Sequence, residues 1–187
     1  MPQFDALLVV SFGGPEGPDQ VVPYLHNVAG GKDIPPAVLD ELTARYMLFG
    51  GVSPINEQTR ALLAALAAEL AAHLPGMSVY WGNRFWHPLL AEAVEQMAED
   101  GIRTALAFVT SAFGSYPSCR AYMEEIERAR AEVGPAAPEI HKLRLYYNHP
   151  GFIEPMAQRV LEALSLIPSE RRAAARLVFT AHSLPVS

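Results

Sequence analysis

The chain has 187 residues, of which 50% are hydrophobic and 18% charged, a composition typical of a folded protein with one full-sized core rather than of a disordered chain. Its formal net charge is −6, with 14 Lys and Arg against 20 Asp and Glu, and the absence of a basic cluster argues against nucleic acid as a partner. We find no signal peptide and no apolar stretch long enough for a transmembrane segment, and the single cysteine, Cys119, permits no internal disulfide, so we expect a cytoplasmic protein.

The first part of the chain predicts one buried strand followed by three helices. The apolar run ALLVVSF, at residues 6–12, is typical of a strand buried on both faces, and it ends at a pair of glycines. Helices are expected at residues 20–28, 37–48 and 57–74. Ser53 lies in the glycine-rich turn between the second and third of these helices.

In the rest of the chain, apolar runs typical of buried strands alternate with amphipathic helical patterns. The expected elements are a strand at 77–81, a helix at 89–99, a strand at 104–111, a helix at 119–133, a strand within 140–147 and a helix at 152–167. This alternation predicts an α/β fold with a doubly wound parallel sheet.

The last stretch, LVFTAHSLPVS, predicts a fifth strand at residues 177–179 with His182 just beyond its carboxyl end. Ligands of open α/β sheets bind beyond the carboxyl ends of the strands. An imidazole at that place can accept a proton or coordinate a metal near neutral pH. The alternative is a histidine that simply bonds a loop carbonyl.

Four predicted strand tips carry unusual residues, and a parallel sheet brings them to one edge. They are residues 12–15, 82–88, 111–119 and 182–183. Their glycines and aromatic side chains suit the close approach of a large planar molecule, although each aromatic ring can instead fill the core of the domain. The aromatic residues are Phe12, Phe85, Trp86, Phe113, Tyr116 and Tyr122.

Several familiar motifs are missing from the sequence. It contains no G-x-G-x-x-G after the first strand, no Walker loop, no G-x-S-x-G and no H-E-x-x-H, so dinucleotide binding and serine hydrolysis lose support. The histidines have no close metal-ligand spacing, which argues against a structural zinc site. We expect His87, which precedes a proline, to be a helix-starting turn residue.

Five stretches of the sequence, in register over the whole chain, resemble the ferrochelatases and most closely the actinobacterial coproporphyrin III ferrochelatases. They are LLVVSFGGPEGP, RYMLFGGVSPIN, YWGNRFWHPLLAEAV, TSAFGSYPSCRAYMEEI and LVFTAHSLP. The resemblance implies a Rossmann-like chelatase fold and a lyase that inserts ferrous iron into coproporphyrin III during heme biosynthesis. Protoporphyrin IX is the alternative substrate. A non-catalytic tetrapyrrole-binding fragment and a flavodoxin-like binding module are the alternative functions.

The resemblance also implies roles for single residues. His182 matches the catalytic histidine that binds Fe²⁺ or takes the pyrrole protons. Ser53 and Tyr122 match positions that donate hydrogen bonds to the porphyrin carboxylates. Arg45 can pair with a propionate or be an ordinary surface residue. Phe12 stands where some relatives have a tyrosine that ligates the product iron, a contact that phenylalanine cannot make.

Two further expectations concern the extent of the chain. Cys119 resembles the first of four cysteines that hold a [2Fe-2S] cluster in some members, but one thiolate cannot hold a cluster, so this role would belong only to a full-length protein. We expect an N-terminal domain at residues 1–148, and a linking helix and the first strand of a truncated second domain at 149–187. The full-length enzyme is expected to be a monomer. The chain alone should be nearly inactive, because a glutamate partner of His182 and the other wall of the porphyrin pocket would lie in the missing part.

Overall fold

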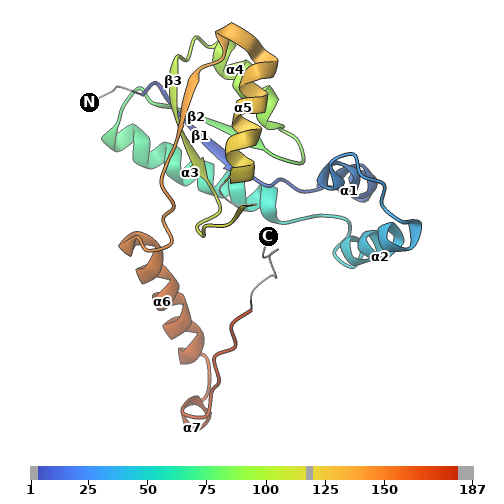
Figure 1. Cartoon of the computed structure of the whole chain (residues 1–187). Helices are drawn as coiled ribbons and strands as arrows, with labels where there is room; N and C mark the ends of the chain where they lie inside the picture. The colour runs from blue at the N-terminus through green and yellow to red at the C-terminus, as the bar shows by residue number, and fades with distance from the viewer. Residues whose placement is uncertain (1–3, 117–119, 181–187) are drawn as a thin grey trace.

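The computed structural model describes residues 4–116 and 120–180. Its centre is a sheet of four parallel strands in the order β2-β1-β3-β4 (Figure 1). The strands are β1 (Ala6–Ser11), β2 (Ser78–Asn83), β3 (Thr104–Val109) and β4 (Glu139–Lys142). The register places Val10 of the central strand beside Gly82 and Val109, so the strands finish at the same edge. The predicted parallel sheet is confirmed.

The helices lie within a few residues of their predicted positions, apart from the short α7, which was not predicted. They are α1 (Val21–Ala29), α2 (Pro36–Met47), α3 (Ile55–His73), α4 (Leu90–Glu99), α5 (Ala121–Val133), α6 (Pro150–Ser165) and α7 (Ser169–Arg172). None of the helices in the described part of the chain is long and apolar enough to cross a membrane.

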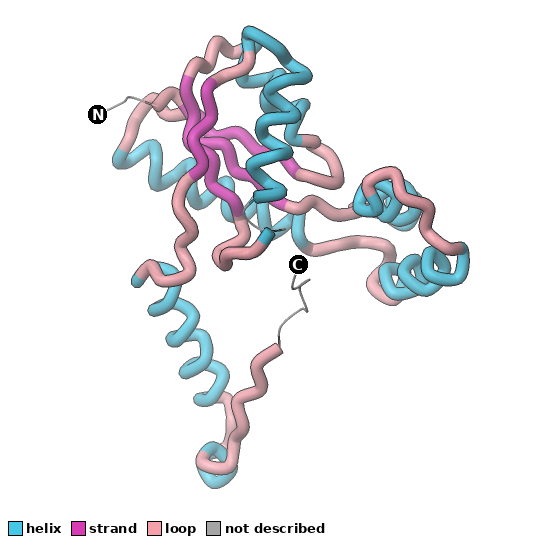
Figure 2. Tube along the Cα trace, viewed as in Figure 1, coloured by secondary structure: helices cyan, strands magenta, loops and turns pink. Residues whose placement is uncertain are grey.

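Helices cover both faces of the sheet because successive side chains of a strand point to opposite sides. Leu8 of β1 packs into the main core together with Val94 of α4 and Ile126 of α5. On the opposite face the Thr59 hydroxyl of α3 lies 3.4 Å from the Ser11 hydroxyl of β1. Figure 2 shows the sheet between these two helical layers, which confirms the doubly wound arrangement.

Helices α1 and α2 lie to one side of the sheet and form a second, smaller core (Figure 1). Its buried residues are Val21, Tyr24 and Leu25 of α1. Phe85 and Trp86, which follow β2, pack against this cluster. The two helices are therefore attached to the sheet at the carboxyl end of β2.

Beyond β4 the chain leaves the sheet, and neither α6 nor α7 has a buried residue. The fifth strand predicted at residues 177–179 is wrong: this segment has no regular secondary structure. Leu177, Val178 and Phe179 are 58%, 83% and 89% exposed. A strand forms only when a neighbouring strand accepts and donates its backbone hydrogen bonds, and no described strand pairs with this segment.

Candidate functional site

The carboxyl ends of the strands converge as predicted. Beyond the ladder of β1 and β2, the Arg84 amide donates to the Ser11 carbonyl and the Phe85 amide to the Phe12 carbonyl, each at 3.0 Å. This pairing brings the rings of Phe12 and Phe85 to 4.6 Å between centroids. The predicted fourth tip, residues 182–183, lies outside the described residues.

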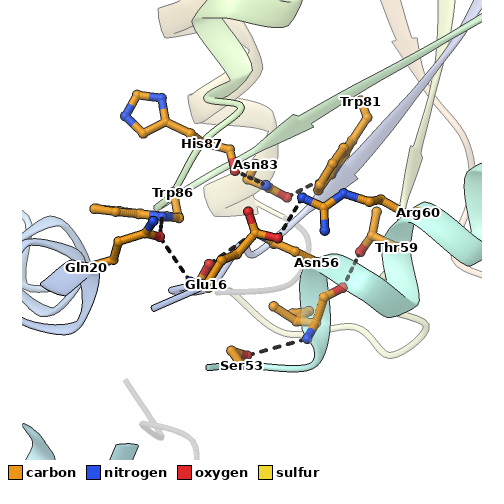
Figure 3. Close-up of polar contacts among 12 residues, drawn as sticks. Glu16, Gln20, Ser53, Asn56, Thr59, Arg60, Trp81, Asn83, Trp86 and His87 are labelled. Atoms are coloured by element: carbon orange, nitrogen blue, oxygen red, sulfur yellow. Dashed lines mark hydrogen bonds and ion pairs between the residues drawn. The ribbon is translucent and has the colours of Figure 1, made fainter. Parts of the chain in front are cut away.

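The loop after β1, residues 13–17, is fastened to two other elements (Figure 3). Gln20 Oε1 accepts hydrogen bonds from the Glu16 amide at 3.0 Å and from Trp86 Nε1 at 2.8 Å. The Glu16 carboxylate also forms an ion pair with Arg60 of α3 at 2.6 Å. The loop is therefore held between α3 and the residues that follow β2.

Two predicted site residues, Arg45 and Ser53, line one cavity of about 400 Å³. The other lining residues are Tyr46, Phe49, Val52 and Pro54. Ser53 is half-buried, and its Oγ accepts a long hydrogen bond of 3.5 Å from the Ile55 amide. Within residues 4–116 and 120–180 this is the one hydrogen bond of the hydroxyl, so its hydrogen is available to a ligand. Arg45 is exposed and pairs with Glu41 one turn earlier at 2.5 Å. An exposed pair of this kind is weak, so a carboxylate ligand can compete for the guanidinium.

Phe49 and Val52, which line this cavity, and their chain neighbours Met47 and Leu48 expose apolar side chains to solvent. Leu48 is 81% exposed and Phe49 is 78% exposed, while Met47 and Val52 are 43% and 45% exposed. Four apolar side chains exposed next to one another are unusual on a soluble surface and mark a place where a ligand or partner covers them. A flat apolar molecule with acidic groups at its edge suits the combination of these side chains with Arg45 and Ser53.

Arg84 is a candidate residue that sequence reasoning missed. Its guanidinium carbon lies 4.6 Å from the centre of the Phe85 ring and 5.8 Å from that of Tyr122. The residue is half-buried, and its buried Nε has no hydrogen-bond partner within residues 4–116 and 120–180. A cation held over aromatic rings with an unsatisfied donor can bind an anion. The one feature of the sequence that could have indicated Arg84 as a site residue is its position directly after a predicted strand.

Tyr122 is only 4% exposed and belongs to the main core. Burial raises the pKa of Tyr122 to about 12, although the nearby Arg84 charge opposes the shift. The phenol therefore stays protonated and is a hydrogen-bond donor at neutral pH. Its predicted contact with a porphyrin carboxylate stays a prediction, as does the absence of an axial ligand at half-buried Phe12.

His87 stabilises the beginning of α4, as expected of a turn residue. Its Nδ1 lies 2.8 Å from Glu92 Oε1, and Glu92 Oε2 accepts a hydrogen bond of 2.6 Å from the Leu89 amide. Figure 3 shows the imidazole pointing away from the contacts around Glu16. The side chain is 61% exposed, so the geometry supports a capping role for His87.

A larger cleft of about 800 Å³ lies at the opposite edge of the sheet, where the strands begin. Asp5, Ser78 and Arg103, which stand at the amino ends of β1, β2 and β3, line it. Because ligands of parallel sheets bind at the carboxyl edge, the smaller cavity beside Ser53 is the better candidate site.

His182 and Cys119 lie outside the described residues, so their predicted roles stay predictions. Within the part of the chain that the structure describes, no group of three His, Cys, Asp or Glu side chains could hold a metal ion. The sequence contains a single cysteine, which does not fit the four thiolates of a [2Fe-2S] cluster.

Comparisons with known proteins agree with the resemblance. Residues 4–187 match the family model described as Ferrochelatase. The chain is 54% identical to the coproporphyrin III ferrochelatase of Frankia alni over 185 residues, 52% identical to that of Nocardia farcinica over 183, and 51% identical to that of Mycolicibacterium smegmatis over 183. These alignments cover 98% of this chain but 47%, 52% and 54% of the three relatives. The chain spans about half the length of the curated relatives that it matches.

Proposed function

Because the chain belongs to the ferrochelatase family, we propose that it forms one wall of the porphyrin site of an enzyme that inserts Fe²⁺ into coproporphyrin III. The observation that carries this proposal is the apolar cavity lined by both Arg45 and Ser53. The relatives named above, all coproporphyrin III ferrochelatases, support the choice of substrate. We further propose that the enzyme acts in the cytoplasm as a monomer.

In this proposal different residues bind the apolar face of the porphyrin and the carboxylates at its edge. The exposed ring of Phe49 packs against the face of the macrocycle. The Ser53 hydroxyl and the Arg45 guanidinium bind carboxylates at the edge of the macrocycle. A hydrogen bond to a charged acceptor is stronger than one to a neutral acceptor. Arg84 and the Tyr122 hydroxyl, which do not line this cavity, are the further donors that we propose for the carboxylates, and the Arg84 guanidinium carbon lies 5.8 Å from the centre of the Tyr122 ring.

Iron insertion exchanges the two pyrrole N–H protons for bonds between Fe²⁺ and the porphyrin nitrogens. The proposed catalytic residue is His182, whose neutral imidazole accepts a pyrrole proton or binds the incoming iron. Protein walls that hold the macrocycle in a bent conformation would expose the nitrogen lone pairs to the metal.

We also propose a division of the chain near residue 148. Residues 1–148 contain all four strands and both cores of the part of the chain that the structure describes. Residues 149–187 would lead to a second domain that supplies the other wall of the site. The relatives, which are about twice as long, support this division.

Titration of the 187-residue chain with coproporphyrin III, followed by the Soret band, tests the proposal. Binding should be weakened about tenfold by Ser53→Ala and by Arg45→Gln, because each removes a donor to a charged group worth about 1.5 kcal/mol or more. Arg128→Gln is the matched control, since Arg128 of α5 likewise pairs with a carboxylate one turn away. No Soret shift with the unmodified chain, or equal effects of both arginine variants, would contradict the proposal.

A parallel titration with protoporphyrin IX distinguishes the two substrates. Coproporphyrin III carries more carboxylates, so the loss of Arg45 should weaken its binding more than the binding of protoporphyrin IX. The opposite order would favour protoporphyrin IX as the substrate.

A further inference from the structure

Asn56, in the first turn of α3, has a side chain whose burial costs stability. The residue is 0% exposed. Its Nδ2 donates a hydrogen bond of 3.1 Å to the Gly14 carbonyl, while its buried Oδ1 has no partner among the described residues. Leaving a buried carbonyl oxygen unpaired destabilises the folded chain, because the oxygen gives up its hydrogen bonds to water and gains none in the protein. An apolar residue of similar size would avoid that cost, so the contact with Gly14 is the feature that needs an explanation.

Gly14 sets the position of Ser53. A Cβ atom built on Gly14 would lie 2.6 Å from Ser53 Cβ and 2.7 Å from Ser53 Oγ, so the bare glycine backbone touches the serine side chain. The Ser53 amide also donates a hydrogen bond of 2.8 Å to the carbonyl of Pro15. Any shift of residues 14–15 therefore moves the Ser53 hydroxyl.

The other side chains that hold this loop act farther along it. Gln20 and Arg60 both bind Glu16. In the described ranges, Asn56 provides the side-chain hydrogen bond to Gly14 itself. Asn56 thus connects the first turn of α3 to the part of the loop that packs on Ser53.

We propose that Asn56 is a positioning residue: by holding the Gly14 carbonyl, it places the Ser53 hydroxyl in the cavity where a porphyrin carboxylate binds. This inference rests on the proposed function of Ser53. It assigns to a buried amide, which does not line the cavity, a share of the affinity for carboxylate-bearing porphyrins.

A double-mutant cycle on the 187-residue chain tests the inference. Asn56→Leu keeps the number and branching of the side-chain heavy atoms and removes the donor, although its methyl groups are bulkier than the amide. Asn56→Ala, which needs no extra room, serves as a second variant. Each should weaken coproporphyrin III binding several-fold, and neither should weaken it further when Ser53→Ala is already present. Thr59→Val is the matched control, because Thr59 is also buried in α3 but its hydroxyl contacts the Ile55 carbonyl and the Ser11 hydroxyl rather than Gly14.

Hydrogen exchange of the Ser53 amide provides a readout that does not depend on porphyrin. Exchange should accelerate in both Asn56 variants and stay unchanged in Thr59→Val. Unchanged exchange in the Asn56 variants, or losses of affinity that add to that of Ser53→Ala, would overturn the positioning role alone. If the unmodified chain bound no coproporphyrin III, the proposed function and the role of Asn56 in binding would both fall.

Discussion

Tyr122 carries an ionisable hydroxyl but is only 4% exposed, and this makes the stability of the chain sensitive to high pH. Burial raises the pKa of Tyr122 to about 12, against 10.0 for an unperturbed tyrosine. The unfolded chain therefore releases this proton first as the pH rises. The contribution of the protonated Tyr122 to the free energy of unfolding is fully present below pH 10. It is lost between pH 10 and 12, at about 1.4 kcal/mol per pH unit.

Urea unfolding at a series of pH values checks this prediction. Tyr122→Phe should flatten the fall in unfolding free energy between pH 10 and 12 by up to about 3 kcal/mol. The difference between the two proteins at pH 8 gives the effect of the substitution itself. Parallel curves for the two proteins above pH 10 would show that the phenol is accessible to water in the folded chain.

Gly82 of β2 lies where α4 packs closely on the strand. A Cβ atom there would lie 2.8 Å from the Leu90 Cα and 2.9 Å from Leu90 Cδ1. Because backbone cannot move aside cheaply, we expect Gly82→Ala to lower the unfolding free energy by about 1–3 kcal/mol, measured by urea denaturation. Gly17→Ala is the control, since its Cβ would meet only the end of the flexible Asp19 side chain. Equal stability of the two variants would contradict this reading of the packing.

The residues of the site were predictable from sequence to different degrees. Ser53 and Arg45 were predicted from the resemblance to the ferrochelatases, and they line the same cavity. Arg84 was missed because its environment depends on the fold. Its guanidinium lies over the rings of Phe85, its neighbour in the sequence, and of Tyr122, which is far away in the sequence. Asn56 was missed for a similar reason, since neither burial nor an unpaired oxygen leaves a mark on a helical sequence pattern.

At the scale of elements, α6 is held to the sheet by one row of aromatic rings. Phe152, in its first turn, contacts Tyr146 at 5.3 Å and Phe113 at 6.1 Å between centroids. Tyr146 in turn stacks on Phe108 of β3 at 5.1 Å. Since α6 buries no residue, this row is the main attachment of the helix near its beginning.

Phe152→Ala should therefore loosen α6 without unfolding the sheet. We expect faster amide hydrogen exchange throughout α6, unchanged exchange in β1, and a loss of less than about 1 kcal/mol in global unfolding free energy. Ile153→Ala is the matched control, because Ile153 is 48% exposed and has no ring to stack on this row. Faster exchange in β1 with Phe152→Ala would mean that α6 and the sheet unfold as one unit.

The strands illustrate why sequence predicts some elements and not others. Residues 6–11 were predicted correctly because β1 is apolar throughout and is central in the sheet, with β2 and β3 as neighbours. Residues 177–179 carry a similar apolar pattern but have no partner strand in the described chain. An apolar run shows that a segment would be stable as a buried strand, but strand formation also requires a neighbour, which the pattern cannot reveal.

At the scale of the whole molecule, apolar side chains are distributed unequally along the chain. The main core is formed by buried apolar side chains of β1, β3, β4, α4 and α5. Beyond β4, the chain exposes Leu166 and Phe179 at 85% and 89%. Exposure of this degree favours burial against a partner surface. It supports the proposal that residues 149–187 lead to a second domain.

The same imbalance predicts that the chain can be shortened without loss of the fold. A variant ending at Asn148 keeps every described strand and both described cores. Its unfolding free energy should therefore fall by less than about 1 kcal/mol, which corresponds to a fall in Tm of no more than about 2–4 °C. It also keeps Arg45 and Ser53, and coproporphyrin III should bind it as it binds the whole chain.

A variant ending at Arg144 is the matched control for this shortening. It also lacks Tyr146, whose hydroxyl donates a hydrogen bond of 2.8 Å to the Thr110 carbonyl and whose ring stacks on Phe108. This variant should be less stable than the one ending at Asn148 by about 1–3 kcal/mol, because a half-buried hydrogen bond and a ring contact are both lost. Thermal unfolding followed by circular dichroism compares the two. Should the variant ending at Asn148 unfold as easily as the shorter one, α6 would belong to the same folding unit as the sheet, and the boundary near residue 148 would be wrong.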